Sequence, residues 1–97
     1  MALSYDESAT LMRDVSFVGR IKVACLHFAT FILDEPSSTA AHNTRYRWAQ
    51  NTLVDADAVA TKVAPAVVMD PQVQTDGSSI TDANLQSSVE TAVQKML

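Results

Sequence analysis

The amino-acid sequence predicts an all-α domain of three to four helices, with a long first helix and an extended non-helical arm at about residues 65–79. Hydrophobic residues make up 47% of the chain and aromatic residues only 6%, so the core must be built mainly from aliphatic side chains and alanine. Apolar residues recur at spacings of three, four and seven, which is the period of a helix. Residues 1–97 are expected to form a single domain, because a chain of this length supports only one core.

The first helix is expected to run from about Ser4 to Leu33. Ser4 followed by Glu7 is typical of a capping box at a helix N-terminus. The helix should end before Pro36, because the residue before a proline avoids helical dihedral angles. Two adjoining stripes predict a broad buried face: Leu11, Val15, Val18, Cys25, Ala29 and Ile32, and next to them Phe17, Ile21, Ala24, Phe28 and Phe31.

A break within this helix is the alternative. Asp14 and Ser16 are both good capping residues, so a second helix could begin between Arg13 and Phe17. Gly19 also weakens a continuous helix, by about 1 kcal/mol relative to alanine.

Three further segments complete the prediction. A second helix should start at the capping residues Ser37 to Thr39 and reach about Leu53, and a third should run from the cap Asp55 to Ala64, where Pro65 stops it. The second helix should turn inward the face that carries His42, Tyr46, Ala49 and Leu53. The last helix has the clearest signal, with Thr81 as its cap and a stripe of Leu85, Val89, Ala92, Val93 and Met96. The first and last helices are expected to form the main packed pair.

Charge limits the classes of partner. The chain has 7 basic and 11 acidic residues, a net charge of −4, and this balance argues against tight nucleic-acid binding, which depends on clustered cations. The most apolar stretch, Val23 to Leu33, is about half of the roughly 20 residues that a membrane span requires. A buried helix segment is therefore expected there, and no membrane association.

The sequence offers no arrangement typical of an enzyme. Cys25 and His27 are two residues apart, so on one helix they point to different faces and make a poor nucleophile pair or metal site. Adding His42 gives no known metal-ligand spacing, and the two glycines, Gly19 and Gly77, cannot form a phosphate-binding loop. No cofactor, metal or catalytic activity is expected.

A cluster of arginines and aromatic residues between His42 and Trp48 is the sharpest feature. Arg, Tyr and Trp supply most of the binding energy at protein interfaces. We expect a partner contact formed by Arg45, Arg47 and Trp48, together with the β-capable run Val67, Val68 and Met69 in the arm, which would add to the edge of a neighbour's sheet. The alternative is that Trp48 fills the core of the monomer and that the run is a packed loop.

Four segments in a fixed order resemble small virion proteins of tailed bacteriophages, of the kind encoded near the capsid and the head–tail connector. The segments are FVGRIKVACLHFATFILDE, HNTRYRWAQNTL, VVMDPQVQ and DGSSITDANLQSSVETAV, and the resemblance extends from Phe17 to Val93. The sequence departs from a typical adaptor in the long, nearly glycine-free interval between its third and last helices.

The resemblance implies a non-enzymatic head–tail connector or adaptor that assembles as a homo-oligomeric ring on the portal. Its partners would be further copies of itself and other virion proteins, such as portal or tail components. The protein would be located in the virion after assembly in the host cytoplasm. A small phage-encoded regulatory or host-protein-binding protein is one alternative, and a capsid or tail accessory protein is another.

Overall fold

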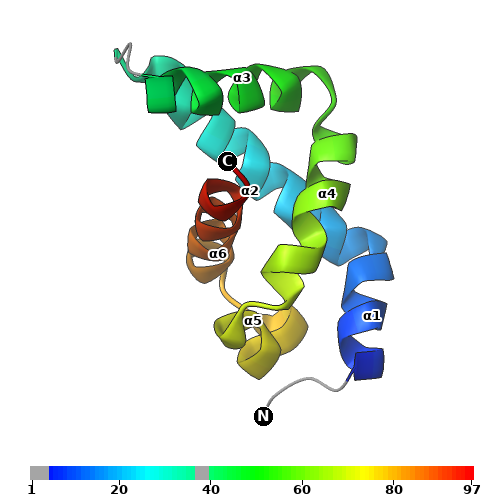
Figure 1. Ribbon diagram of the computed structural model, residues 1–97. Coiled ribbons are helices and arrows are strands. Elements are labelled where there is room, and N and C mark those ends of the chain that lie inside the picture. Colours follow the sequence, from blue (N-terminus) through cyan, green and yellow to red (C-terminus); the bar gives the residue numbers. More distant parts are fainter. Residues whose placement is uncertain (1–4, 37–39) are drawn as a thin grey trace.

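The computed structural model describes the backbone of residues 5–36 and 40–97 and the side chains of residues 6–36 and 43–97. The described chain is all-helical, as predicted, and contains six α-helices, one 3-10 turn and no strand. The elements are α1 (Tyr5–Arg13), α2 (Val15–Asp34), α3 (Ala40–Val54), α4 (Ala56–Val68), α5 (Pro71–Asp76), the turn η1 (Gly77–Ser79) and α6 (Asp82–Met96). Together they form an elongated bundle with extents of 42 × 22 × 19 Å (Figure 1).

The longest helix, α2, is the centre of the bundle. The helices α3, α4 and α6 all pack against it, and α3 lies across one end of it (Figure 1). The expectation that the first and last helices form the main packed pair is wrong, because α2 contacts α3 and α4 more extensively than it contacts α6. One helix therefore has to present apolar residues in three directions.

The predicted long first helix is two helices, which was the alternative. Asp14 caps α2: its carboxylate accepts hydrogen bonds from the backbone amides of Ser16 at 2.9 Å and Phe17 at 3.2 Å. These bonds satisfy amides that have no partner inside the helix and fix the start of α2. The helix ends at Asp34, as Pro36 predicts. The expected capping residue Ser4 lies outside the described residues.

The predicted start of the second helix, Ser37 to Thr39, also lies outside the described residues. The predicted inward face of α3 is right for Ala49 and wrong for Tyr46 and Leu53, and the side chain of His42 lies outside the described residues. Ala49 and Thr52 are buried and Trp48 is half-buried, whereas Tyr46 and Leu53 are exposed. The helix is thus rotated, so that its indole side faces α2 and two of its apolar residues face solvent.

The predicted arm at residues 65–79 is wrong, because α4 continues through Pro65 to Val68. The buried residues Ala60, Val63, Ala64, Val67 and Val68 follow a helical period across the proline. Pro65 itself is exposed, so its ring lies on the solvent side of the helix. A proline inside a helix costs about 3 kcal/mol. Full burial of the two valines that follow it gains about 1.5–3 kcal/mol each.

The rest of the expected arm is α5 and η1. Asp70 and Pro71, which resemble a turn in the sequence, are the N-cap and the first residue of α5, a position where proline is favoured. One carboxylate oxygen of Asp70 accepts from the Gln72 amide at 2.8 Å, and the other accepts from the Ser88 hydroxyl at 2.9 Å. The same side chain therefore caps α5 and joins it to a buried position of α6.

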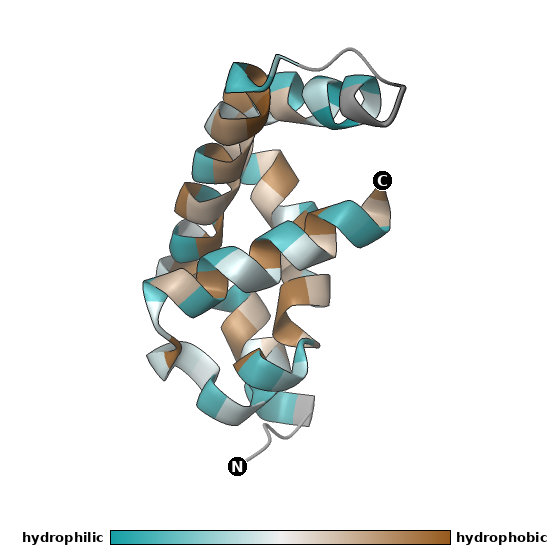
Figure 2. Ribbon diagram, turned by 90° about the vertical axis from the view of Figure 1, so that its left-hand side faces the viewer, coloured by the Kyte–Doolittle hydropathy of each residue, from teal (hydrophilic) through white to brown (hydrophobic). Residues whose placement is uncertain are grey.

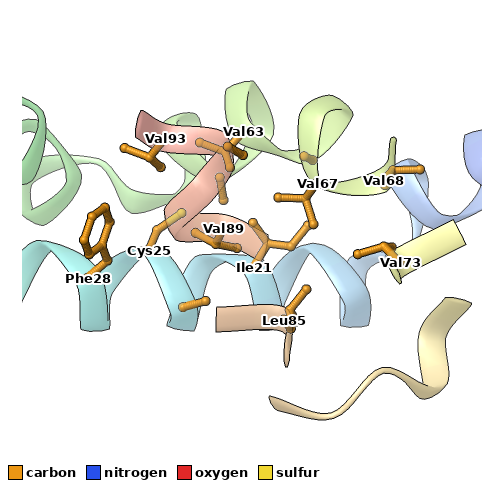
Figure 3. Close-up of a cluster of buried hydrophobic side chains, with 14 of the residues drawn as sticks. Ile21, Cys25, Phe28, Val63, Val67, Val68, Val73, Leu85, Val89 and Val93 are labelled. Carbon is orange, nitrogen blue, oxygen red and sulfur yellow. The ribbon is translucent and has the colours of Figure 1, made fainter. Parts of the chain in front are cut away.

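The final helix begins as predicted, with the Thr81 hydroxyl accepting from the Asn84 amide at 3.2 Å. Its buried residues include Leu85, Val89 and Val93, of which Val89 and Val93 lie between α2 and α4 (Figure 3). There they meet Ile21, Cys25 and Phe28 of α2 and Val63 and Val67 of α4 (Figure 3). The core is aliphatic, with two phenylalanines, as the composition predicts.

Candidate functional site

Arg45 and Trp48 share one face of α3, as their spacing predicts, and that face lies against α2. The Trp48 and Phe28 rings are 5.7 Å apart between centroids and tilted by 51°. The Arg45 guanidinium lies 5.8 Å from the centroid of the same Phe28 ring and is 3.5 Å from the Glu35 carboxylate. Both side chains therefore attach α3 to α2, and only their exposed parts remain accessible to a partner.

The opposite side of α3 points away from the bundle. We call it the α3 outer face, and its exposed residues are Asn43, Tyr46, Arg47, Gln50, Asn51, Leu53 and Val54. Leu53 is 54% exposed and Val54 is 87% exposed. Among the described residues Arg47 makes no ion pair. The segment Ala40–Val54 contains no acidic residue, so this face is both apolar and cationic.

The other half of the predicted site does not form. Val67 and Val68 are fully buried in α4, and only Met69, 64% exposed at the end of the helix, is accessible. Helical backbone leaves no free strand edge, so the predicted addition to a neighbouring sheet is wrong for this segment. Met69 lies on a different part of the chain from the arginine cluster, beside α5, where the Gln74 amide is 3.7 Å from its sulfur.

Sequence reasoning missed a groove between α2 and α6. Its volume is about 790 Å³. The α2 wall carries Gly19, Val23, His27 and Phe31, and the α6 wall carries Ala83, Gln86 and Glu90. Val23 is 54% exposed and Phe31 is 60% exposed, although the apolar stripe of α2 predicts that Phe31 is buried. Figure 2 shows hydrophobic positions along the length of α2, including the side beside α6.

The signal for this groove is the width of the apolar face of α2. Two adjoining stripes cover more of the helix than α3, α4 and α6 bury, and the surplus remains at the surface. Val23 and Phe31 are exposed about two turns apart on α2, with His27 between them, and both line this depression. Exposed apolar residues beside a depression are typical of interaction sites, whereas single exposed ones are common everywhere. We therefore treat this groove and the α3 outer face as the candidate functional surfaces.

Acidic side chains surround the groove. Asp82 and Glu90 line it from α6, and Asp34 lies beside Phe31 at the end of α2. Among the described residues Arg20 is the only cation that lines this groove, and its guanidinium is 3.0 Å from Asp82 and also donates to the backbone carbonyls of Ser78 and Ile80. Arg20 is thus engaged in holding η1 and the start of α6 against α2, and the groove keeps a net negative character.

The described residues contain no group of three or more His, Cys, Asp or Glu side chains placed to hold a metal ion. Burial raises the pKa of the Cys25 thiol to about 12, because the thiolate would lose its hydration. At neutral pH this thiol is protonated and enclosed by the core, which makes it a poor nucleophile. His27 is exposed in the groove wall and does not lie beside Cys25 on the same face of α2.

One of the described helices, α2, is long and apolar enough to cross a membrane, judged by length and composition alone. In its most apolar window 39% of the residues are buried inside the bundle. Central helices of soluble proteins and signal sequences near the N-terminus have the same properties, so this finding is weak support for a membrane role.

Comparison of the chain with models of protein families, with curated proteins and with solved structures found no match.

Proposed function

We propose that this chain is a non-enzymatic structural subunit that acts by self-association. In line with the resemblance of its sequence, we propose that it is a virion protein of a tailed bacteriophage, a head–tail connector or adaptor that assembles as a ring on the portal. The observation that carries the proposal is the exposed side of α2, where Val23 and Phe31 are each more than half exposed beside a groove of about 790 Å³.

The energetics favour coverage of this surface. Removing apolar surface from water gains about 25 cal/mol per Å², and α2 carries this exposed apolar side along a helix that is otherwise the centre of the core. Association of several copies would bury part of this exposed apolar surface.

The chemistry of the chain is also consistent with a structural role. The one cysteine is buried, and the polar side chains that the fold brings together serve as helix caps or hold neighbouring elements in place. A net charge of −4 suits a protein that lies near a DNA channel without binding DNA tightly.

The first test is the mass of the purified chain in solution by light scattering, followed by negative-stain imaging. We expect one discrete oligomer, visible as a ring. Mass spectrometry of particles from a phage that encodes the chain should then find many copies per particle. A monomer or dimer absent from particles contradicts the proposal and favours the regulatory or host-protein-binding alternative. Copies spread over the whole capsid or tail favour an accessory protein.

A variant tests whether the exposed side of α2 is responsible. Val23→Asp combined with Phe31→Asp should abolish the oligomer and keep the helical circular dichroism signal, because both side chains are more than half exposed. Val15→Asp is the matched control. Val15 is 86% exposed on the same helix but does not line the groove, so this variant should assemble like the unchanged chain.

A further inference from the structure

The two candidate surfaces differ in position and in charge. The groove between α2 and α6 extends along the side of the bundle, whereas the α3 outer face is at the end of the bundle that α3 crosses (Figure 1). The groove has acidic side chains around it, whereas the α3 outer face carries apolar residues and one charged side chain, the cation Arg47. Because the chain holds both surfaces apart, they cannot close on each other within one copy.

We infer that the groove receives the α3 outer face of a second copy of this chain, so that copies associate head to tail. This inference rests on the proposed function, self-association, and specifies which surfaces meet. When two different surfaces form the interface, the growing assembly always has one free groove at one end and one free α3 outer face at the other. Each end can therefore bind a further copy. Such an interface produces a closed ring when the rotation between neighbouring copies closes, and an open filament when it does not.

Charge complementarity supports this occupant. Glu90 and Asp34 beside the groove are matched by Arg47, which is exposed and unpaired within the described chain and lies on a helix without acidic residues. Asp82 is already engaged by Arg20. Complementary charges contribute more to orientation and rate of association than to affinity, so they would fix the direction in which α3 enters.

The groove and the α3 outer face also match in length and in the spacing of their apolar residues. From Ser16 to Phe31 the α2 wall extends for about 22 Å, and α3 has the same length, at 1.5 Å per helical residue. Leu53 and Tyr46 are seven residues apart and therefore lie on one side of α3, whereas Arg47, the residue after Tyr46, is turned by about 100° from it. On the groove side, Val23 and Phe31 are eight apart on α2. Each partner thus offers apolar anchors about two helical turns apart.

A symmetric contact between two grooves fits less well. It would place Asp34, Asp82 and Glu90 against the same residues of the second copy, and like charges brought together cost several kcal/mol. The one cation of the groove, Arg20, is already bound to Asp82 and to two backbone carbonyls. The head-to-tail contact replaces this repulsion with attraction.

The test uses two variants of the full chain, each blocked on one surface. The face variant, Arg47→Glu with Leu53→Asp, keeps the groove, and the groove variant, Val23→Asp with Phe31→Asp, keeps the α3 outer face. Lys62→Glu is the matched control for loss of a cation, because Lys62 is exposed on α4 away from both surfaces. Circular dichroism should show that all of these variants remain folded.

Light scattering should give the oligomer for the unchanged chain and for Lys62→Glu, and the monomer mass for each blocked variant alone. An equimolar mixture of the two blocked variants should give twice the monomer mass and nothing larger, because one functional surface remains on each. If the face variant assembles like the unchanged chain, or if the mixture stays monomeric, the head-to-tail inference is wrong while self-association stands. If the unchanged chain is itself a monomer, both proposals are wrong.

Discussion

The helices α3 and α6 have the same length, 15 residues, but they are held in very different ways. The last helix buries five residues, Leu85, Ser88, Val89, Ala92 and Val93, in the centre of the bundle. Among its described side chains α3 buries only Ala49 and Thr52, and it depends on half-buried Trp48 and Arg45 for its contact with Phe28. One helix thus builds the core, whereas the other covers the end of α2 and presents a surface.

The difference teaches where function can be placed in so small a chain. A residue in α6 that changes will disturb the core, because each inward side chain is enclosed on all sides. The outer face of α3 is free of that constraint, so it can carry apolar and charged residues for a partner. Leu53, which is 54% exposed, and Val54, which is 87% exposed, are two apolar residues of this kind.

The same substitution in both helices gives the largest expected difference. Leu85→Ala should lower the free energy of unfolding by about 2–5 kcal/mol, the usual loss for a buried leucine with the cavity it leaves. Leu53→Ala should lower it by less than about 0.5 kcal/mol, because surface substitutions rarely do more. Urea unfolding followed by circular dichroism measures both. Similar losses for the two variants would break the comparison.

Removing the indole tests how α3 is attached. Trp48→Ala should lower the free energy of unfolding by about 2 kcal/mol, below the 3–5 typical of a fully buried aromatic residue, because Trp48 is half-buried. Hydrogen exchange should show amides of α3 losing protection while those of α6 change little. Trp48→Phe keeps an aromatic ring against Phe28 and should retain most of the stability. Equal loss of protection in both helices would show that α3 and α6 open as one unit.

Gly19 tests the space between α2 and α6. It lies in the middle of a helix, and a Cβ added there meets no other atom within 4 Å. Gly19→Ala should therefore raise the free energy of unfolding by about 0.5–1 kcal/mol, because alanine loses less conformational freedom in a helix. Thermal unfolding is the measurement. A loss of stability would mean that the groove is closed in solution and that α6 lies closer to α2.

The buried thiol gives the smallest effect. The pKa of Cys25 is about 12 in the folded chain and 9.0 for the free side chain, so the folded state binds its proton more tightly. Its contribution to stability is complete well below pH 9, begins to fall as the pH approaches 9 and is lost as the pH rises to about 12. Between pH 8 and pH 9 the loss should be about 0.4 kcal/mol. Cys25→Ala removes this contribution, so the pH dependence of its unfolding should lack it.

The reactivity of the Cys25 thiol also distinguishes the opening of α6 from the opening of α3. Cys25 points towards Val63, Val89 and Val93 of α4 and α6 (Figure 3). Labelling by a thiol reagent at pH 8 should accelerate in Leu85→Ala, which weakens α6. It should change little in Trp48→Ala if α3 opens alone. Rapid labelling of the unchanged chain would contradict the buried position of this residue.

The predictions from sequence succeeded where the signal is local. The helix starts at Asp55 and Thr81 were predicted, and Asp14 was named as the alternative start, because a cap and the amide it binds are two or three residues apart. The prediction of an extended arm is wrong because Pro65 indicates the end of a helix, whereas the apolar period continues through it from Ala60 to Val68. Burial of the valines outweighs the local preference of the proline.

The candidate site was predicted only in part. Arg47 is exposed on α3, and Arg45 and Trp48 share a face as expected, but their contacts with Phe28 and Glu35 depend on how α3 folds back over α2. The groove was not predicted, because the sequence shows that α2 is apolar on many sides without showing which sides the other helices cover. Val67 and Val68 were assigned to the surface and belong to the core.

By itself, the sequence determined the helical class, the aliphatic core and several helix starts, because hydrophobic period and capping act over a few residues. Only the tertiary structure decided that α4 passes through Pro65, that Phe31 remains exposed and that α3 turns its cationic face outward. Contacts such as those of Arg20 with Ser78 and Ile80 join residues 58 and 60 positions apart. Such contacts exist only after the chain has packed, and no local pattern encodes them.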